Sequence, residues 1–447
     1  MAKLTGIDIY KLLPKTNCGD CQVPTCMAFA MQVAAKKMPL EKCPHVSDQA
    51  KQALAESAEP PMRTVTVGSG PKALQMGGET VLFRHEEKFH RPPGVAVRVT
   101  DAEDVAKAVQ AVTGLQFIRA GKEVRVDLIA LEQTRDAGAF AAKAAEIAKA
   151  CDLPLVLVSS DSAALGLALQ NLSGKRPLIC GANRQNFAEL AALAKSNNAP
   201  LAVQGETLDE LAGLTAEIKK LGVNDLVLAP KTQNLSDALT KLTQLRRLAL
   251  EKNFRALGFP VIAFTDPRDP FQETSQAITL VCKYASIVVM TGRESWQVLP
   301  VLTARFNIFT DPQVPNAVEA KLYKVGDPGP DAPVIVTTNF ALTYFMVEGE
   351  IENSKVPAYV AVVETGGLGV LNSYADDKLS GETIAAAVRK CGALDQVKHK
   401  KLVIPGLVAV LKGELEDESG CDVIVGPEEA AGLPGFLKNE WKRVAAV

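Results

Sequence analysis

The sequence is poor in several features, and each shortage excludes a class of protein. Only 5% of its 447 residues are aromatic and its formal net charge is −2, so it lacks the stacking side chains and basic surface that nucleic-acid binding needs. No apolar run approaches the roughly 20 residues of a membrane-spanning helix. Asp8, Lys11 and Lys15 interrupt the first apolar stretch, which is not typical of a signal peptide. We therefore expect a cytoplasmic protein that binds neither nucleic acid nor membrane.

Cysteine, in contrast, is present and unevenly distributed. Four of the nine cysteines fall within 26 residues near the N-terminus. Disulfides are rare in the cytosol because thiols are kept reduced there, so we expect this group to bind a metal. The other five are scattered singly and are interpreted as small buried hydrophobic residues: Cys151, Cys180, Cys282, Cys391 and Cys421.

A chain of this length is too long for one hydrophobic core, and its composition divides it into three zones. The segment 55–63 contains Pro60-Pro61 and is predicted to be a linker. After it, short β-branched runs alternate with Ala- and Leu-rich helical stretches, which is typical of parallel strands buried on both faces. Eight such runs predict a (β/α)8 barrel, with starts near Val124, Leu153, Arg176, Ala199, Asn224, Phe259, Ala285 and Phe306.

Two further expectations concern the barrel. A ninth run begins at Gly94, so either it or the last run must lie outside the barrel. A hairpin over 64–84, turning at Gly77-Gly78, is predicted to cover one barrel end.

A second break, 325–333, is dense in glycine and proline and is predicted to be a hinge. Four more strand-like runs follow it, separated by helical segments, which indicates a doubly wound domain. The predicted fold class is therefore multidomain α/β. It comprises a small N-terminal 4Fe–4S domain (1–57), a central TIM-like barrel (58–324) and a C-terminal Rossmann-like domain (325–447).

The N-terminal cysteines, Cys18, Cys21, Cys26 and Cys43, have the spacing C-x2-C-x4-C-x16-C, followed by Pro44. Four thiolates suit either a cubane iron–sulfur cluster or a structural zinc ion. Zinc ribbons usually have two separated C-x2-C pairs, whereas here three cysteines crowd together and the fourth stands alone. The spacing therefore favours a 4Fe–4S cluster over zinc. His45 could also bind metal, but an ordinary surface histidine is the preferred interpretation.

A single cluster implies one-electron transfer to a redox acceptor, so we searched for a second cofactor site. The stretch 65–73 approximates a dinucleotide fingerprint, but Gly77-Gly78 follows it in place of a helix, and a hairpin is favoured. Three strand ends in the last zone carry glycines, hydroxyls or amides: 336–345, 366–376 and 425–436. Their meeting at one carboxyl edge predicts a ligand crevice.

Taken together, the chain resembles the large (gamma) subunit of the corrinoid iron–sulfur protein of the acetyl-CoA (Wood–Ljungdahl) pathway. The matching stretches span all three zones, and they include NCGDCQVPTCMAFAM, KCPHVSDQA, ETVLFRHEEKFH, FTDPQVP, TTNFALTYFMVEGEIENSK, GLGVLNSYAD, IPGLVAVLKGELED and VIVGPEEAAG. The resemblance implies a methyl carrier with a 4Fe–4S cluster in the first domain and a corrinoid in the last. It also implies partners: a smaller barrel subunit in a heterodimer, a methyltetrahydrofolate methyltransferase, and acetyl-CoA synthase/CO dehydrogenase.

One absence agrees with this resemblance. Many corrinoid proteins place a histidine below cobalt with D-x-H-x-x-G, and none of the four histidines here lies in that motif. The implied corrinoid is therefore base-off without a histidine ligand, which makes Co(II) easier to reduce to Co(I). The cluster would reactivate cobalt after accidental oxidation.

The resemblance predicts corrinoid contacts at the three strand ends. They are Thr338, Asn339, Thr343, Gly369, Val370, Leu371, Asn372, Ser373 and Gly432. The family often has threonine where Asn372 stands, so a hydrogen bond from this position is less certain. No catalytic residue is predicted, and the chain is interpreted as the carrier subunit of a methyltransferase system.

Two alternatives stay open at this point. The first is a redox enzyme with an active site in the barrel, for which Asp266, Asp269 and Asp311 are candidates; their neighbouring prolines favour capping turns instead. The second is a scaffold subunit with a zinc-stabilised N-terminus.

Overall fold

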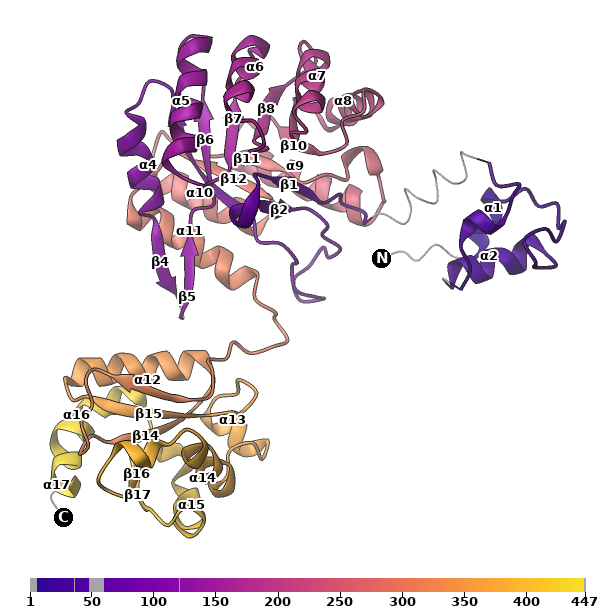
Figure 1. Cartoon of the computed structure of the whole chain (residues 1–447). Coiled ribbons are helices and arrows are strands. Elements are labelled where there is room, and N and C mark those ends of the chain that lie inside the picture. Colours follow the sequence, from indigo (N-terminus) through magenta and orange to yellow (C-terminus); the bar gives the residue numbers. More distant parts are fainter. Residues whose placement is uncertain (1–5, 36, 48–59, 120, 446–447) are drawn as a thin grey trace. The chain divides into compact units, whose positions relative to one another are not determined.

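The computed structural model describes residues 6–35, 37–47, 60–119 and 121–445. By its internal contacts the chain divides into two compact units, 1–117 with 124–309, and 118–123 with 310–447. The N-terminal cysteine segment, the barrel and the C-terminal sheet are each described by themselves (Figure 1).

The cysteine segment folds around two short helices, α1 (Gly6–Leu12) and α2 (Cys26–Ala34), and a 3-10 turn, η1 (Leu40–Lys42). Thr25 begins α2, and its hydroxyl accepts a hydrogen bond from the Ala28 amide at 3.1 Å. A small apolar core joins the helices around Phe29, which is 1% exposed. Most of the linker 55–63 lies outside the described residues.

The central part is an eight-stranded parallel barrel, which confirms the predicted architecture. Its strands are β3 (Gly94–Thr100), β6 (Leu128–Glu132), β7 (Leu155–Val158), β8 (Leu178–Ala182), β9 (Leu201–Gly205), β10 (Leu226–Pro230), β11 (Ile262–Phe264) and β12 (Ile287–Met290). A single bridge between Leu228 and Val261 connects β10 to β11, so the barrel is nearly closed. The run at Gly94 is therefore inside the barrel. The last run, at Phe306, is helical and outside it.

Helices surround the strands (Figure 1). They are α4 (Val105–Thr113), α5 (Ala137–Ala150), α6 (Ser162–Asn171), α7 (Phe187–Ser196), α8 (Leu208–Lys220), α9 (Leu235–Leu250), α10 (Pro270–Cys282) and α11 (Ser295–Ile308). Alternate strand residues face in opposite directions, so Val95 and Val97 pack under the helices while Ala96 faces the barrel interior. A short two-stranded hairpin, β4 (Gln116–Arg119) with β5 (Lys122–Arg125), follows α4.

A second hairpin, β1 (Val65–Val67) with β2 (Leu74–Met76), closes the amino-terminal end of the barrel. Val65 and Met76 belong to the interior core, and the Leu74 side chain lies against Gly94 at the start of β3. The predicted turn at Gly77-Gly78 is wrong, because the strands turn earlier, through the 3-10 turn η2 (Gly70–Lys72). The interpretation of 65–73 as part of a hairpin is confirmed.

The C-terminal part is a five-stranded sheet in the order β13-β15-β14-β16-β17. Four parallel strands, all predicted, are β14 (Val334–Thr338), β15 (Ala358–Val363), β16 (Lys401–Ile404) and β17 (Asp422–Val425). An antiparallel edge strand, β13 (Leu322–Val325), pairs with β15 and was not predicted. The hinge prediction for 325–333 is wrong, because this segment joins β13 to β14 within one sheet. The domain boundaries at 57/58 and 324/325 stay predictions.

Helices cover both faces of this sheet, as a doubly wound domain requires (Figure 1). Their bounds are α12 (Ala341–Ser354), α13 (Val370–Ala375), α14 (Gly381–Lys390), α15 (Lys412–Ser419), α16 (Leu433–Gly435) and α17 (Trp441–Ala445), with short turns η4 (Ala393–Gln396), η5 (Gly406–Leu411), η6 (Ala430–Gly432) and η7 (Phe436–Glu440). Val334 and Val336 pack with α14 and α15, while Ile335 between them packs with α12 and α16. This alternation explains why the strands appear as continuous apolar runs.

Candidate functional site

Two of the four clustered cysteines lie in the loop before α2, and a third, Cys26, is the first residue of that helix. Asn17 fixes Cys26 from both sides: its side-chain oxygen accepts from the Cys26 amide at 2.8 Å, and its own amide donates to the Cys26 sulfur at 3.4 Å. Gly19 has φ +81°, a left-handed conformation that lets the chain turn sharply between Cys18 and Cys21. The segment before α2 is therefore held by a sharp turn at Gly19 and by the contacts of Asn17 with Cys26.

The four thiols differ in environment. Cys21, Cys26 and Cys43 are 5–7% exposed and belong to one apolar core, whereas Cys18 is exposed, and none forms a disulfide. Among the described residues, the one set of three or more Cys, His, Asp or Glu with ligand atoms within 4.8 Å of one another contains a single cysteine. The four sulfurs are thus not gathered as around one zinc ion, and this donor set, with an amide donating to sulfur, fits an iron–sulfur cluster.

That set of three is Cys18, Asp20 and His45. The His45 Nε2 and Asp20 Oδ2 atoms are 2.6 Å apart. Hydrogen bonds from His45 and from the Cys18 thiol hold the pKa of Asp20 below its ordinary value. His45 is thus paired with a carboxylate, which the sequence did not predict.

The C-terminal sheet offers a second site at its carboxyl edge. From β14 the chain goes to β15 on one side and then crosses to β16 on the other, so the strand order reverses at β14. β14 pairs with β15 over five residues but with β16 only at Ile335 and Val403. Strands that separate at a point of reversed order leave a crevice at their carboxyl ends, where open α/β sheets bind ligands.

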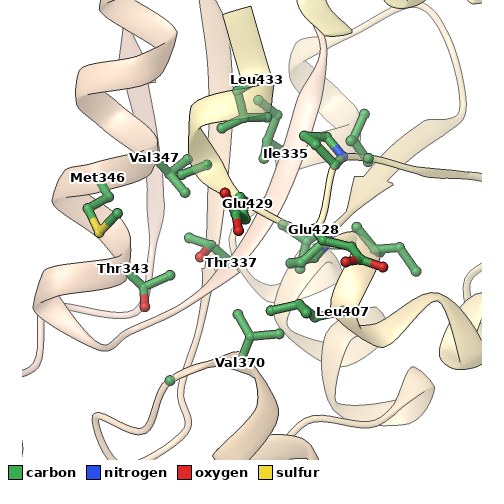
Figure 2. A pocket seen from close by; sticks show the side chains of 18 of the residues that line it. Ile335, Thr337, Thr343, Met346, Val347, Val370, Leu407, Glu428, Glu429 and Leu433 are labelled. Carbon is green, nitrogen blue, oxygen red and sulfur yellow. The ribbon is translucent and has the colours of Figure 1, made fainter.

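A pocket of about 450 Å³ lies in this crevice. Figure 2 shows its apolar lining, with Val347 from α12, Val370 from α13, and Leu407 after β16. Met346, Leu371 and Leu407 also line it and remain 41–53% exposed. A mainly apolar pocket that leaves large hydrophobic side chains in solvent is suited to a large, partly apolar ligand.

The pocket also contains an unsatisfied polar group. Thr337 lines it and is 2% exposed, yet its hydroxyl has no hydrogen-bond partner among the described residues, and the same holds for Thr338. A buried hydroxyl without a partner costs about 1–3 kcal/mol. A bound ligand that offers a donor or acceptor removes that cost, so Thr337 fits a pocket built for a ligand with polar side groups.

The predicted corrinoid contacts divide into two groups. Five of them line the pocket: Thr343, Gly369, Val370, Leu371 and Asn372. The other four, Thr338, Asn339, Ser373 and Gly432, lie at the same sheet edge outside the lining. All nine stay predictions as corrinoid contacts.

Asn339 stabilises the loop that follows β15. Its side-chain oxygen accepts from the Thr365 amide, the Thr365 hydroxyl and the Gly367 amide at 2.8–3.0 Å, and its Nδ2 donates to Glu364 at 2.7 Å. Asn339 thereby fixes the loop between β15 and α13, which carries Gly369. Ser373, 0% exposed, donates to the Val370 carbonyl at 2.9 Å and stabilises α13 in the same way.

Sixteen lining residues were not among the predicted contacts. Nine of them lie within the predicted strand ends 336–345 and 425–436: Val336, Thr337, Gly426, Pro427, Glu428, Glu429, Ala430, Ala431 and Leu433. The other seven lie outside those ranges: Ile335, Met346, Val347, Val403, Ile404, Pro405 and Leu407. The run of β16 was predicted as a strand, and the IPGL sequence at its end could have marked a fourth wall. Figure 2 shows Glu428 and Glu429 among the apolar side chains, where carboxylates can accept hydrogen bonds from a ligand.

The candidate acids of a redox enzyme, Asp266 and Asp269 after β11 and Asp311 after α11, have other partners. Asp269 accepts from the Phe271 and Gln272 amides and begins α10, Asp266 pairs with Arg268, and Asp311 accepts from the Gln313 amide. A cavity of about 900 Å³ lies between α9 and α10. Its Lys231 pairs with Glu206 at 2.7 Å. The interpretation as capping turns agrees with these bonds: Asp269 caps a helix, and Asp266 and Asp311 accept from the amide two residues later.

In the part of the chain that the structure describes, no helix combines the length and apolar character needed to span a bilayer.

Comparisons with known proteins cover nearly the whole chain. A model of the family described as CO dehydrogenase/acetyl-CoA synthase delta subunit matches residues 64–437, and an Fe-S cluster family model matches residues 13–45. The chain is 46% identical to the corrinoid/iron-sulfur protein large subunit of Moorella thermoacetica, over 97% of this chain and 98% of that protein.

Other proteins are similar to this chain at lower sequence identity. The acetyl-CoA decarbonylase/synthase complex subunit gamma of Methanothermobacter thermautotrophicus is 35% identical over 97% of this chain and 98% of that protein. Among solved structures, dihydropteroate synthase of Yersinia pestis is similar at 16% identity and a TM-score of 0.36, covering 48% of this chain and 93% of that one. The chain is therefore a member of the corrinoid/iron-sulfur protein large-subunit family.

Proposed function

We propose that this chain carries a methyl group on a corrinoid held by its C-terminal sheet, with a 4Fe–4S cluster in its N-terminal segment. When bound, the corrinoid supplies a cobalt that accepts the methyl group from methyltetrahydrofolate through a methyltransferase and yields it to acetyl-CoA synthase. The cluster would restore Co(II) to Co(I). The observation that carries the proposal is the apolar pocket at the strand reversal, with the unpartnered Thr337 hydroxyl inside it.

The residues of the chain would hold the corrinoid in distinct ways. The apolar walls, including Val347, Val370 and Leu433, exclude water from the buried side of the ligand. Thr337, Glu428 and Glu429 offer hydrogen-bonding groups to the polar side groups of a corrin ring. The described residues that line the pocket include no histidine, and the corrinoid is proposed to be base-off without a histidine ligand.

The cysteine segment would hold the cluster through Cys18, Cys21, Cys26 and Cys43. The amide of Asn17, which donates to the Cys26 sulfur, lies where it would stabilise negative charge on that ligand. The proposed partners are a smaller barrel subunit in a heterodimer, the methyltransferase, and acetyl-CoA synthase/CO dehydrogenase.

The test is anaerobic purification with ample corrinoid, followed by metal analysis and a visible spectrum. We expect iron and cobalt together, with the absorption of both a cluster and a corrinoid. Iron without cobalt would favour a redox enzyme, and zinc without either would favour a scaffold subunit; both results contradict the proposal.

A variant separates the two cofactors. In Cys21→Ala the cluster should be lost while corrinoid content stays unchanged, so methyl loading should begin normally and then fail as cobalt collects in the Co(II) state. Cys282→Ala, which removes a cysteine of α10 in the barrel, is the matched control and should load methyl groups without this decline. Equal durability of the two variants would contradict the proposed role of the cluster.

A further inference from the structure

Three exposed side chains of the cysteine segment lie close together. Only one of them, Cys18, has a role in the proposed function. The Cys18 sulfur, an Asp20 carboxylate oxygen and a His45 ring nitrogen all lie within 4.8 Å of one another. The Asp20 and His45 side chains are 52% and 50% exposed. Cys18 therefore lies with two other metal-ligand side chains, whereas Cys21, Cys26 and Cys43 are buried in the apolar core.

Sulfur, imidazole nitrogen and carboxylate oxygen are all ligands of divalent transition metals such as zinc. Around one tetrahedral zinc ion, metal–ligand distances of about 2.0–2.3 Å place the donor atoms roughly 3.3–3.8 Å apart. The three donors here lie within 4.8 Å of one another, and the His45 and Asp20 atoms are 2.6 Å apart, so these distances lie on both sides of that spacing. Because all three side chains are exposed, small rotations about their side-chain bonds can adjust the distances without disturbing the core.

We propose that Cys18, Asp20 and His45 form a binding site for a single divalent transition-metal ion, open when the cluster is absent. Binding replaces the thiol proton of Cys18 by the metal and releases that proton to solvent, with water in the fourth position. The inference rests on the proposed function in one respect: Cys18 is also a proposed cluster ligand. The Cys18 sulfur can then bind either the single ion or the cluster, so zinc competes with cluster assembly.

The experiment uses Co²⁺ as the probe, because its thiolate complexes absorb in the visible and near-ultraviolet range. The full-length protein is purified anaerobically, freed of iron with a chelator, and titrated with Co²⁺. We expect one bound ion with the charge-transfer absorption of a single thiolate. The variant Cys21→Ala/Cys26→Ala/Cys43→Ala, which keeps Cys18, should give the same band.

His45→Ala should weaken Co²⁺ binding at least tenfold, while His85→Ala, an exposed histidine outside the group, should leave it unchanged. Equal titration of His45→Ala and the unmodified chain would overturn the proposal, as would a band with the intensity of several thiolates. If the triple variant does not fold, the single His45→Ala titration decides the matter by itself.

A second measurement separates this inference from the cluster proposal. Cluster reconstitution with iron and sulfide should be slowed by prior zinc loading in the unmodified chain, but not in His45→Ala. Zinc that slows both equally contradicts the shared site. Failure of the zinc-free chain to form any cluster would instead contradict the proposed function and leave the metal titration as an independent result.

Discussion

At the carboxyl edge of the barrel, buried polar side chains bind one another, whereas at the carboxyl edge of the C-terminal sheet two threonine hydroxyls have no partner among the described residues. In the barrel, Glu273 is 2% exposed and accepts from the Thr265 hydroxyl at 2.8 Å and from the Thr291 and Gly292 amides at 2.6 and 3.0 Å. The barrel strands and the strands β14 to β17 of the C-terminal sheet are parallel, so topology alone would allow a ligand site at either carboxyl edge.

The difference indicates how each edge is used. A network in which every buried group has a partner stabilises the fold, whereas one that leaves a hydroxyl unsatisfied lowers stability until a ligand binds. The buried network around Glu273 is therefore interpreted as structural support, and the C-terminal edge as the ligand site. Three predictions test this comparison.

The largest effect is expected for Glu273→Gln at the barrel edge. Glutamine keeps one acceptor oxygen, but its NH2 group must face the amide of either Thr291 or Gly292, because these two donors bind different carboxylate oxygens of Glu273. A buried N–H group therefore loses its partner. We expect a loss of about 2–3 kcal/mol in the free energy of unfolding, measured by calorimetry on the full-length protein. Glu189→Gln, an exposed residue of α7, is the control and should change it by less than about 0.5 kcal/mol. A small effect at Glu273 would refute its structural role.

A matched pair of threonine substitutions tests the comparison directly. Thr265→Val removes a hydroxyl that donates to Glu273, and should cost about 1–2 kcal/mol. Thr337→Val removes a hydroxyl without a partner, so the cofactor-free protein should be equally stable or more stable by up to about 1 kcal/mol. The same Thr337→Val variant should retain less corrinoid during dialysis. Equal destabilisation by both substitutions, with corrinoid retention unchanged, would remove the distinction between the two edges.

The smallest effect concerns pH at the barrel edge. Burial by itself would raise the pKa of Asp101, but hydrogen bonds from Thr134 and from the Arg135 amide outweigh it and hold this pKa below the ordinary value of 3.8. A lowered pKa contributes stability that is present above the unfolded-state pKa and is lost as the pH falls through the folded-state value.

Asp101→Asn should therefore be less stable than the unmodified chain at pH 7, by about 1 kcal/mol. This difference should shrink as the pH falls below about 4, as measured by chemical unfolding at several pH values. A difference that stays constant down to pH 2 would show that the charge of Asp101 is not the cause.

The sequence by itself determined several features that depend on residues near one another in the chain, although it misplaced the turn of the first hairpin. The spacing of the four cysteines predicted a cluster segment, and β-branched runs predicted the parallel strands, because burial on both faces requires continuous apolar residues. The glycine-marked ends of β15 and β17 predicted part of the pocket. The caps at Asp269 and Asp311 follow from their own local sequence as well.

Only the tertiary structure decided what depends on residues far apart in the chain. β13 contains Tyr323 and Lys324 and becomes a strand through pairing with β15. The segment that was expected to be a hinge therefore lies within a sheet. Thr337 has the same chemistry as Thr265, and only the groups around each decide which hydroxyl is left for a ligand. His45 meets Asp20 across 25 residues because a loop returns there. Such pairings are set by packing, which no local pattern of the sequence encodes.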